Sequence, residues 1–181
     1  TQHYVPQFYL KEFSHNTNYG KNSNNTIWLF DKSNHSIKER GINNKLQISY
    51  YYSYIQGKNK YNHKIEFKFQ KIETQFQILL QKIKNSVEKY TQNKIGLNFD
   101  LNDKLLMAVY ILSQLKRVPI FFDECYQGLF EKFQVLNNKH NIQQNSDDLR
   151  REVRNYTLDL IDNFDDNNHI LDAIFKRDWH I

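Results

Sequence analysis

Apolar side chains between His63 and Tyr90 recur every three or four residues. Such spacing places side chains in one stripe along an amphipathic helix. The stripe consists of Ile65, Phe69, Ile72, Phe76, Leu79, Ile83, Val87 and Tyr90. We therefore predict one continuous helix over residues 63–90. The residues expected to be buried in it are Phe69, Ile72, Phe76 and Ile83.

Three further helices are expected after this one. Residues 100–117 contain the run LLMAVYIL, which is apolar on all sides and is expected at the centre of the fold. Pro119 interrupts or restarts this helix, and the third helix covers about residues 120–137. Ser146 is the predicted N-cap of the fourth helix. The apolar stripes are Phe122, Tyr126, Leu129, Phe133 and Leu136 in the third helix, and Leu149, Val153, Tyr156 and Leu160 in the fourth.

The first residues of the chain predict a short docked helix. Pro6 suits the first turn, where its missing N–H would have no partner. Tyr9, Leu10 and Phe13 then share one face. After a polar loop, the stretch TIWLFDKSNHSIKERGI predicts two strands around a turn at residues 33–35. The stretch ISYYYSYI fits either a strand or a buried loop.

These elements predict a mainly α (α+β) fold, a bundle of about four helices with a docked N-terminal segment and a small β-hairpin. We expect a single domain over residues 1–181, in which residues 1–61 form the N-terminal segment and hairpin and residues 62–175 form the bundle. A short helix is expected around residues 170–175. The final KRDWHI predicts a strand without a partner, so the chain is expected to be the N-terminal portion of a longer protein.

Composition narrows the classes of protein to consider. The single cysteine, Cys125, excludes an intramolecular disulfide framework and a cysteine-rich zinc site, and favours a reducing, cytoplasmic setting. No apolar run approaches the roughly 20 residues that span a bilayer, and no signal-peptide pattern is present. No membrane association is therefore expected. The net charge of +5 favours anionic partners such as nucleic acid.

Two polar stripes border the apolar stripe of the long helix. One consists of His63, Glu66, Gln70, Glu73 and Gln77, and the other of Lys64, Lys68, Lys71 and Lys82. A carboxylate at the edge of a buried surface is partly desolvated, which raises its pKa. Both stripes could be solvated flanks in which the carboxylates pair with basic side chains. Alternatively, Glu66 and Glu73 belong to a functional site.

Arg117 ends a helix that is otherwise apolar, and Gln114 lies one turn earlier on the same side. A buried arginine needs a carboxylate or a phosphate as its partner. If Glu73 is that partner, the result is a structural ion pair between two helices. If a substrate phosphate takes its place, His3 could act as general acid or base, and Glu66 could orient it or bind a divalent metal. The second arrangement would suit phosphodiester cleavage.

The candidate catalytic residues are therefore His3, Glu66, Glu73 and Arg117. The candidate substrate contacts are Tyr4, Gln114, Lys68 and Lys71. Docking of the N-terminal helix on the central helix pair would bring His3 within one side-chain length of Glu73, Gln114 or Arg117. The identity of a metal stays open.

Other patterns are weaker indications of function. His63 and Glu66 have a metal-compatible spacing, but no second copy of the pair exists. Cys125 has no evident base beside it and fits a small packed residue. The tyrosines of residues 50–54 could stack bases, although such residues more often simply pack. The chain has no glycine-rich phosphate loop, no serine nucleophile elbow and no R-x4-6-H pattern.

Five stretches, in this order, resemble a known family: QHYVPQFYLKEF, IWLFDK, IEFKFQKIE, LSQLKRVP and DWHI. The family comprises uncharacterised bacterial and phage proteins with a His-Tyr-Val-Pro signature, the domain-of-unknown-function family 4238. Its members continue into a segment resembling F-x-T-S-D-N-P, which this sequence lacks, so the chain is expected to match the N-terminal part of the family's domain. The positions implied by the resemblance are His3, Tyr4, Pro6, Tyr9, Glu66, Glu73, Gln114, Arg117 and Trp179.

Two classes of function follow from these patterns. One is a nucleic-acid-directed effector, such as a nuclease of a bacterial anti-phage or toxin system. The other is a non-catalytic binding or regulatory module, with a protein partner, in which the His-Tyr-Val-Pro segment is a structural plug. The exposure of the His3 imidazole would discriminate them, because an enzyme needs it to face a cleft.

Overall fold

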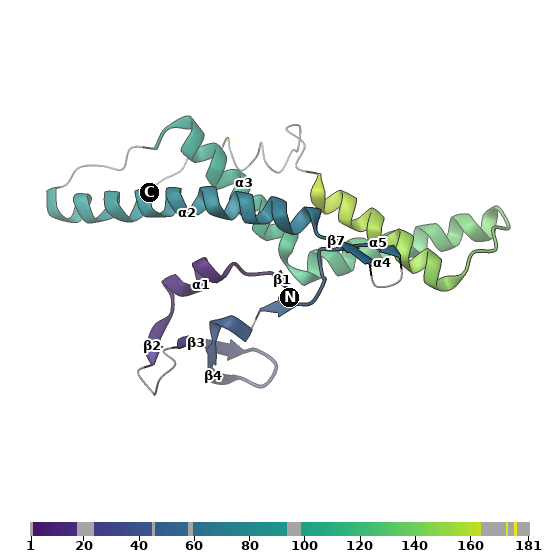
Figure 1. Cartoon of the computed structure of the whole chain (residues 1–181), viewed down its shortest axis with the longest axis horizontal. Helices are drawn as coiled ribbons and strands as arrows, with labels where there is room; N and C mark the ends of the chain where they lie inside the picture. Colours follow the sequence, from purple (N-terminus) through teal and green to yellow (C-terminus); the bar gives the residue numbers. More distant parts are fainter. Residues whose placement is uncertain are drawn as a thin grey trace. The chain divides into compact units, whose positions relative to one another are not determined.

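The computed structural model describes residues 2–17, 24–44, 46–57, 60–93, 99–163, 173 and 176 (Figure 1). The chain separates into two compact units, Thr1–Tyr51 and Tyr52–Ile181. The mainly helical α+β class is confirmed. The division between the units falls before the hairpin of residues 54–62, which therefore belongs with the helices rather than with the N-terminal segment.

The described part of the N-terminal unit is built from short antiparallel strands, one short helix and one 3-10 turn. Its strands are β1 (Gln2–His3), β2 (His15–Thr17), β3 (Asn24–Asp31), β4 (Ser36–Gly41) and β5 (Gln47–Ile48), its helix is α1 (Gln7–Glu12), and its 3-10 turn is η1 (Ile42–Asn44). Strands β2, β3 and β4 form a sheet in that order, and β1 pairs with β5. The predicted β3–β4 hairpin is confirmed, with Phe30 opposite Ile37. The shorter strands were not predicted.

The core of the N-terminal unit is small. Leu10 from α1, Ile27 from β3 and Ile42 from η1 are buried together. The prediction for α1 is correct for Leu10 only, because Tyr9 is 40% exposed and Phe13 is 65% exposed. The reason is the length of the helix: six residues present a single turn to the core, and Phe13 follows the last of them. Pro6 precedes the helix as its N-cap residue.

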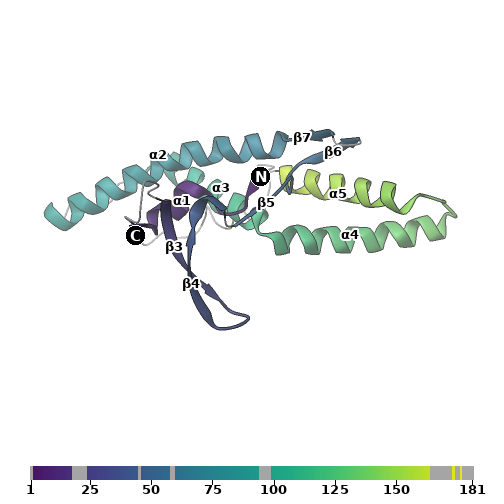
Figure 2. The ribbon, with the colours of Figure 1, turned by 60° about the horizontal axis from the view of Figure 1, so that its bottom comes forward.

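Four helices and a hairpin form the described part of the second unit. Its elements are β6 (Tyr54–Gly57), β7 (Lys60–Asn62), α2 (Lys64–Asn93), α3 (Leu101–Arg117), α4 (Pro119–Lys139) and α5 (Ser146–Asp162). Helix α2 packs against α3, and α4 packs against α5, as Figures 1 and 2 both show. The β6–β7 hairpin contacts α5, where the Asn155 side chain donates to the carbonyl of Ile55 and accepts from its N–H, each at 3.0 Å.

Local sequence explains where these helices begin and end. Asp100 caps α3 through a reciprocal pair of hydrogen bonds with Asp103. Val118 is extended because Pro119 disfavours a helical conformation in the residue before it, and α3 and α4 are bent by 62° there. The N-cap of α5 is Asn145, whose side chain accepts from the Asp147 N–H at 2.9 Å. The expected cap at Ser146 was one residue late.

The long predicted helix is confirmed as α2, but its buried stripe is shorter than expected. Phe69, Ile72 and Phe76 are buried, whereas Ile83 is only partly buried. Val87 and Tyr90 are 45% and 50% exposed. Lys82 pairs with Asp103 in the first turn of α3, so α3 provides no further surface for the turns of α2 beyond that point.

The later helices also bury different positions from those expected. On α4, Phe122 is buried but Leu136 is 50% exposed, and on α5 Tyr156 and Leu160 are 50% and 43% exposed. Burial on α5 falls on Leu149, Val153, Thr157, Leu158 and Ile161. Helix α3 is buried on one side only, because Leu105 and Leu115 are 45% and 49% exposed. The predicted elements at residues 170–175 and 176–181, including Trp179, lie outside the described residues.

Candidate functional site

Arg117 is buried at the end of α3 and pairs with a carboxylate from α2. Its side chain is 2% exposed, and its Nη1 donates to Glu73 Oε1. The guanidinium carbon lies 4.7 Å from the centroid of the Phe69 ring, and the Arg117 carbonyl accepts from the Tyr52 hydroxyl. The ion pair between two helices, one of the two interpretations of Glu73, is therefore present.

Glu66 lies two turns before Glu73 on α2, so both carboxylates share one face of the helix. Burial raises the pKa of Glu66, and the neighbouring charge of Glu73 adds to this, whereas the charge of Arg117 acts in the opposite direction. Glu66 Oε2 is buried and has no hydrogen-bond partner among the described residues. Glu66 is thus a carboxyl group that holds its proton more tightly than an exposed one. We refer to Glu66, Glu73 and Arg117 as the carboxylate–arginine cluster.

Aromatic packing supports the helices on which the cluster lies. Tyr52 and Phe69 meet edge to face with ring centroids 5.4 Å apart, and both are buried. Two turns further along α2, Phe76 stacks on Tyr110 of α3. Gln114 is half-buried on α3, and its amide lies 3.4 Å from the Ser113 hydroxyl. These contacts fix the backbone from which Glu73 and Arg117 extend.

Two lysines of the basic stripe bind the carboxyl end of α5. Lys68 Nζ donates to Asp162 Oδ1 at 3.1 Å and to the Asp162 carbonyl, and Lys64 Nζ lies 2.5 Å from Asp162 Oδ2. Burial alone would raise the pKa of Asp162, but the hydrogen bonds from these lysines lower it. Lys68, a candidate substrate contact, thus has a structural partner 94 residues away. Lys71 is exposed.

Lys116 is a further buried cation, and the sequence analysis did not single it out. Its Nζ lies 3.3 Å and 3.4 Å from the carbonyl oxygens of Leu160 and Ile161, and it also donates to the Asn163 carbonyl. The last carbonyls of a helix have no partner within the helix and carry partial negative charge. Burial lowers the pKa of Lys116, as does the charge of Lys68. A lysine inside an apolar helix was the signal that could have revealed this contact.

The weaker candidates have local structural contacts. His63 Nδ1 lies 2.7 Å from the Ser53 hydroxyl. Among the tyrosines of residues 50–54, Tyr52 is fully buried, and the Tyr54 hydroxyl donates to Asp159 at 2.8 Å. Burial and this hydrogen bond raise the pKa of Tyr54. The Cys125 thiol is partly buried, which raises its pKa.

His3 and Tyr4 belong to the structure of the N-terminal unit. The Gln7 side-chain amide donates to His3 Nε2 at 3.0 Å, and the Tyr4 N–H donates to the Leu46 carbonyl at 2.9 Å. The opening His-Tyr-Val-Pro segment therefore connects strand β1 to the N-cap of helix α1. The expectation that His3 joins the carboxylate–arginine cluster stays a prediction.

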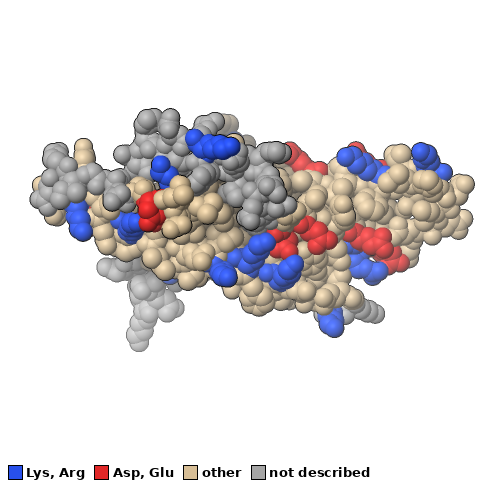
Figure 3. All heavy atoms as spheres, turned by 90° about the horizontal axis from the view of Figure 1, so that it is seen from above, with Lys and Arg blue, Asp and Glu red and all other residues tan. Residues whose placement is uncertain are grey.

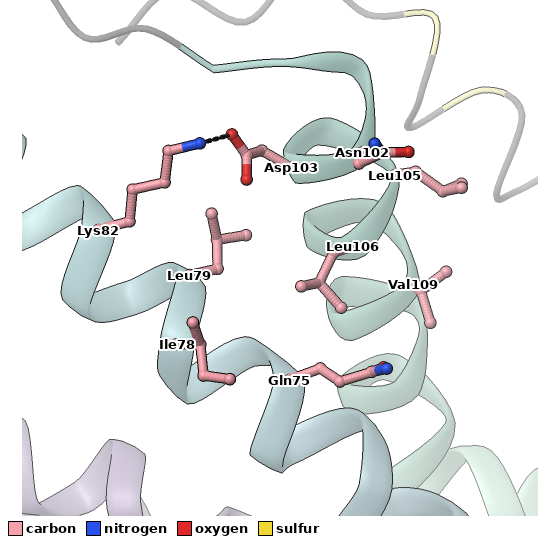
Figure 4. A pocket seen from close by; sticks show the side chains of 9 residues that line it. All are labelled: Gln75, Ile78, Leu79, Lys82, Asn102, Asp103, Leu105, Leu106 and Val109. Carbon is pink, nitrogen blue, oxygen red and sulfur yellow. Dashed lines mark hydrogen bonds and ion pairs between the residues drawn. The ribbon is translucent and has the colours of Figure 1, made fainter.

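An apolar groove of about 480 Å³ lies between α2 and α3 (Figure 4). Its lining comprises Gln75, Ile78, Leu79, Lys82, Asn102, Asp103, Leu105, Leu106 and Val109. The Lys82–Asp103 ion pair crosses one end of it. At 3.6 residues per turn, Ile78 and Lys82 lie on the opposite edge of the apolar stripe from Glu66 and Glu73. The groove and the cluster are thus separate features of the same helix pair.

No group of three or more His, Cys, Asp or Glu side chains among the described residues is arranged to hold a metal ion. On the face seen in Figure 3, Lys and Arg side chains are interspersed with Asp and Glu. None of the described helices is long and apolar enough to cross a membrane alone, and only the bent pair α3 and α4 passes that test, by length and composition.

Comparison with known proteins assigns the family. A search of curated proteins and a search of solved structures each gave no match. The model of a family described as "Protein of unknown function (DUF4238)" matches residues 1–181. The suspected family is confirmed: the chain belongs to the DUF4238 proteins of unknown function.

Proposed function

We propose that this protein is a nucleic-acid-directed effector. In this proposal it is a nuclease that cleaves phosphodiester bonds and belongs to a bacterial anti-phage or toxin system. The observation that carries the proposal is Glu66, a partly buried carboxyl with a raised pKa and an unpartnered oxygen beside the Glu73–Arg117 ion pair. A carboxyl whose pKa moves towards neutral is suited to transfer protons. The resemblance to bacterial and phage proteins suggests the biological setting.

In the proposed reaction, water adds to phosphorus as the bond to the leaving oxygen breaks. Glu66 donates its proton to the leaving oxygen, and the proton lost by the attacking water restores the acid. Arg117 stabilises the negative charge on the phosphate, for which its planar guanidinium is suited. The phosphate competes with the Glu73 carboxylate for this guanidinium.

Cleavage by the full chain tests this proposal. Labelled single-stranded and duplex DNA and RNA are incubated with wild-type protein, with and without Mg²⁺ or Mn²⁺. Glu66→Gln removes the acid, and Glu88→Gln makes the same change at an exposed position of the same helix. We expect cleavage by wild type and Glu88→Gln, and a rate about 10²–10⁴-fold lower for Glu66→Gln. Absence of cleavage by wild type, or equal rates for the two variants, would refute the proposal.

The second candidate is a non-catalytic binding or regulatory module. It is favoured by the burial of Arg117, which already has a carboxylate partner, and by the pairing of β1 with β5. In that case His3→Ala and Arg117→Ala would destabilise the protein without altering any separable activity. A catalytic role would instead show as lost cleavage in protein that is still folded by circular dichroism.

A further inference from the structure

Strand β3 carries large apolar side chains on both of its faces. Ile27 is buried in the core of the N-terminal unit, and Leu29 packs against that core. Because successive side chains of a strand point to opposite faces, Trp28 and Phe30 project from the other face of the sheet. Trp28 is 62% exposed and Phe30 is 56% exposed. Trp28 and Phe30, the two largest side chains of β3, are therefore exposed to solvent in the folded unit.

Two histidine rings extend this exposed surface. The His15 ring stacks on Trp28, with centroids 6.0 Å apart and planes inclined by 15°. The His35 ring meets Phe30 edge to face at 6.3 Å. Ile37, which lies opposite Phe30 in the register of β3 and β4, is 65% exposed. We refer to Trp28, Phe30, His15 and His35 as the aromatic face.

The one carboxylate within this surface is engaged by its neighbours. Thr26 Oγ1 donates to Glu39 Oε1 at 2.6 Å, and His15 Nε2 lies 2.9 Å from the same oxygen. The hydrogen bond from Thr26, with a smaller contribution from His15, holds the pKa of Glu39 below its ordinary value. Hydrogen bonds therefore hold the Glu39 carboxylate in place opposite Trp28 in the register of the two strands.

The charge of the N-terminal unit favours an anionic partner. Residues 1–51 contain six Lys and Arg but three Asp and Glu. Lys32, in the turn between β3 and β4, is exposed on the hairpin that carries Trp28 and Phe30, so it can contact a phosphate while the rings contact bases. Lys38 and Arg40 on β4 are also exposed, but they lie opposite Leu29 and Ile27 in the register and therefore project from the other face of the sheet. They contribute to the net positive charge of the unit, which attracts an anionic partner.

We propose that the aromatic face binds single-stranded nucleic acid by stacking bases on Trp28 and Phe30. Exposed aromatic rings on a β-sheet are a recurring means of binding unpaired bases, whereas a duplex keeps its base faces stacked and inaccessible. The proposal rests on the proposed function, because it assigns to that function a substrate class and a binding surface.

Binding is measured by fluorescence anisotropy with labelled oligonucleotides in the Glu66→Gln background, so that the probe stays intact. Single-stranded DNA, single-stranded RNA and the matching duplexes are compared. Trp28→Ala and Phe30→Ala should each weaken single-strand binding by about 5- to 150-fold, the range for loss of one stacked base. Phe67→Ala, which removes an aromatic ring of 65% exposure from α2, should leave the affinity unchanged.

A direct spectroscopic readout is available because the chain contains two tryptophans, Trp28 and Trp179. In a Trp179→Phe variant, Trp28 is the single indole, and base stacking should quench its fluorescence in step with the anisotropy change. Size-exclusion chromatography of wild type and Trp28→Ala tests the competing occupant, a second copy of the chain. A dimer that Trp28→Ala dissociates, with unchanged oligonucleotide affinity, would overturn the proposal.

The outcomes separate this inference from the proposed function. If single strands bind with Trp28-dependent affinity but are never cleaved, the nuclease proposal fails and the aromatic face stands. If wild type cleaves nucleic acid while Trp28→Ala and Phe30→Ala bind like Phe67→Ala, the aromatic face is refuted and the cleavage chemistry stands. If no oligonucleotide binds, the aromatic face is refuted as well.

Discussion

In the helical unit the largest of the fully buried side chains is an arginine, whereas in the N-terminal unit the largest side chain of the central strand is exposed. The helical unit packs long amphipathic helices against each other and can surround Arg117 with Phe69 and Glu73. The N-terminal unit has one short helix and a three-stranded sheet, which provide a core for one face of the sheet.

This difference in burial determines what a substitution in each unit should change. A buried charge requires a compensating partner, so the carboxylate–arginine cluster contributes to stability as well as to any chemistry. An exposed ring contributes little to folding, so Trp28 can be removed with little structural consequence. Variants of the helical unit should therefore alter stability strongly, and variants of the aromatic face should alter binding alone.

The largest effect is expected for Phe76→Ala. Phe76 is 4% exposed and stacks on Tyr110, so its truncation should lower the free energy of unfolding by about 3–5 kcal/mol. Denaturant titration measures this, with Phe67→Ala as the exposed control on the same helix. A loss below about 1 kcal/mol would show that the α2 stripe is not core.

Arg117→Ala should cost about 3 kcal/mol, because it removes one partner of a buried ion pair and leaves Glu73 uncompensated. The double variant Arg117→Met with Glu73→Leu removes both charges and should recover most of that loss, since apolar replacement of a buried pair is often neutral. Equal instability of the single and double variants in the same titration would mean that packing against Phe69, rather than the ion pair, is what Arg117 contributes.

Glu66→Gln should stabilise the protein at neutral pH. Burial raises the pKa of Glu66 in the folded state above its ordinary value of 4.5, so the unfolded chain loses this proton at lower pH than the folded protein. The folded state is then penalised as pH rises from about 4.5 through the raised pKa. Unfolding titrations of wild type and Glu66→Gln should diverge over that window and converge below it. A variant less stable than wild type at pH 7 would contradict this.

The smallest effect on stability is expected for Trp28→Ala and Phe30→Ala. Both side chains are more than half exposed, so each substitution should change the free energy of unfolding by no more than about 0.5 kcal/mol. Thermal unfolding monitored by circular dichroism checks this. A large loss would show that these rings pack against another part of the chain, which would remove the contrast between the units.

The elements that sequence predicted well are those with a long repeating pattern. Regular apolar spacing from Ile65 to Tyr90 sufficed to predict α2, a helix of 30 residues. Pro119 marked the break between α3 and α4 because proline constrains the residue before it. Strands of two or three residues, such as β1 and β5, carry too few positions for alternation to be recognised. The exposure of Val87 and Tyr90 depends on where α3 begins, which spacing within α2 cannot indicate.

The candidate site was predicted to a similar extent. Glu66 and Glu73 could be placed together because seven residues make about two helical turns, and the need of a buried arginine for a partner linked Arg117 to them. The pairing of Lys68 with Asp162 joins residues 94 positions apart, and no local pattern encodes such a contact. The aromatic face could have been suspected from IWLF, because four successive apolar residues in a strand leave apolar side chains on both of its faces.

The raised pKa of Glu66 is the property on which the proposed function most depends. Carbon-13 NMR titration of the glutamate carboxyl groups measures it directly, with Glu66→Gln to assign the resonance. We expect Glu66 to titrate above its ordinary value of 4.5. Titration of Glu66 at or below that ordinary value would show that the cluster stabilises the charged carboxylate, and would contradict its assignment as a proton donor.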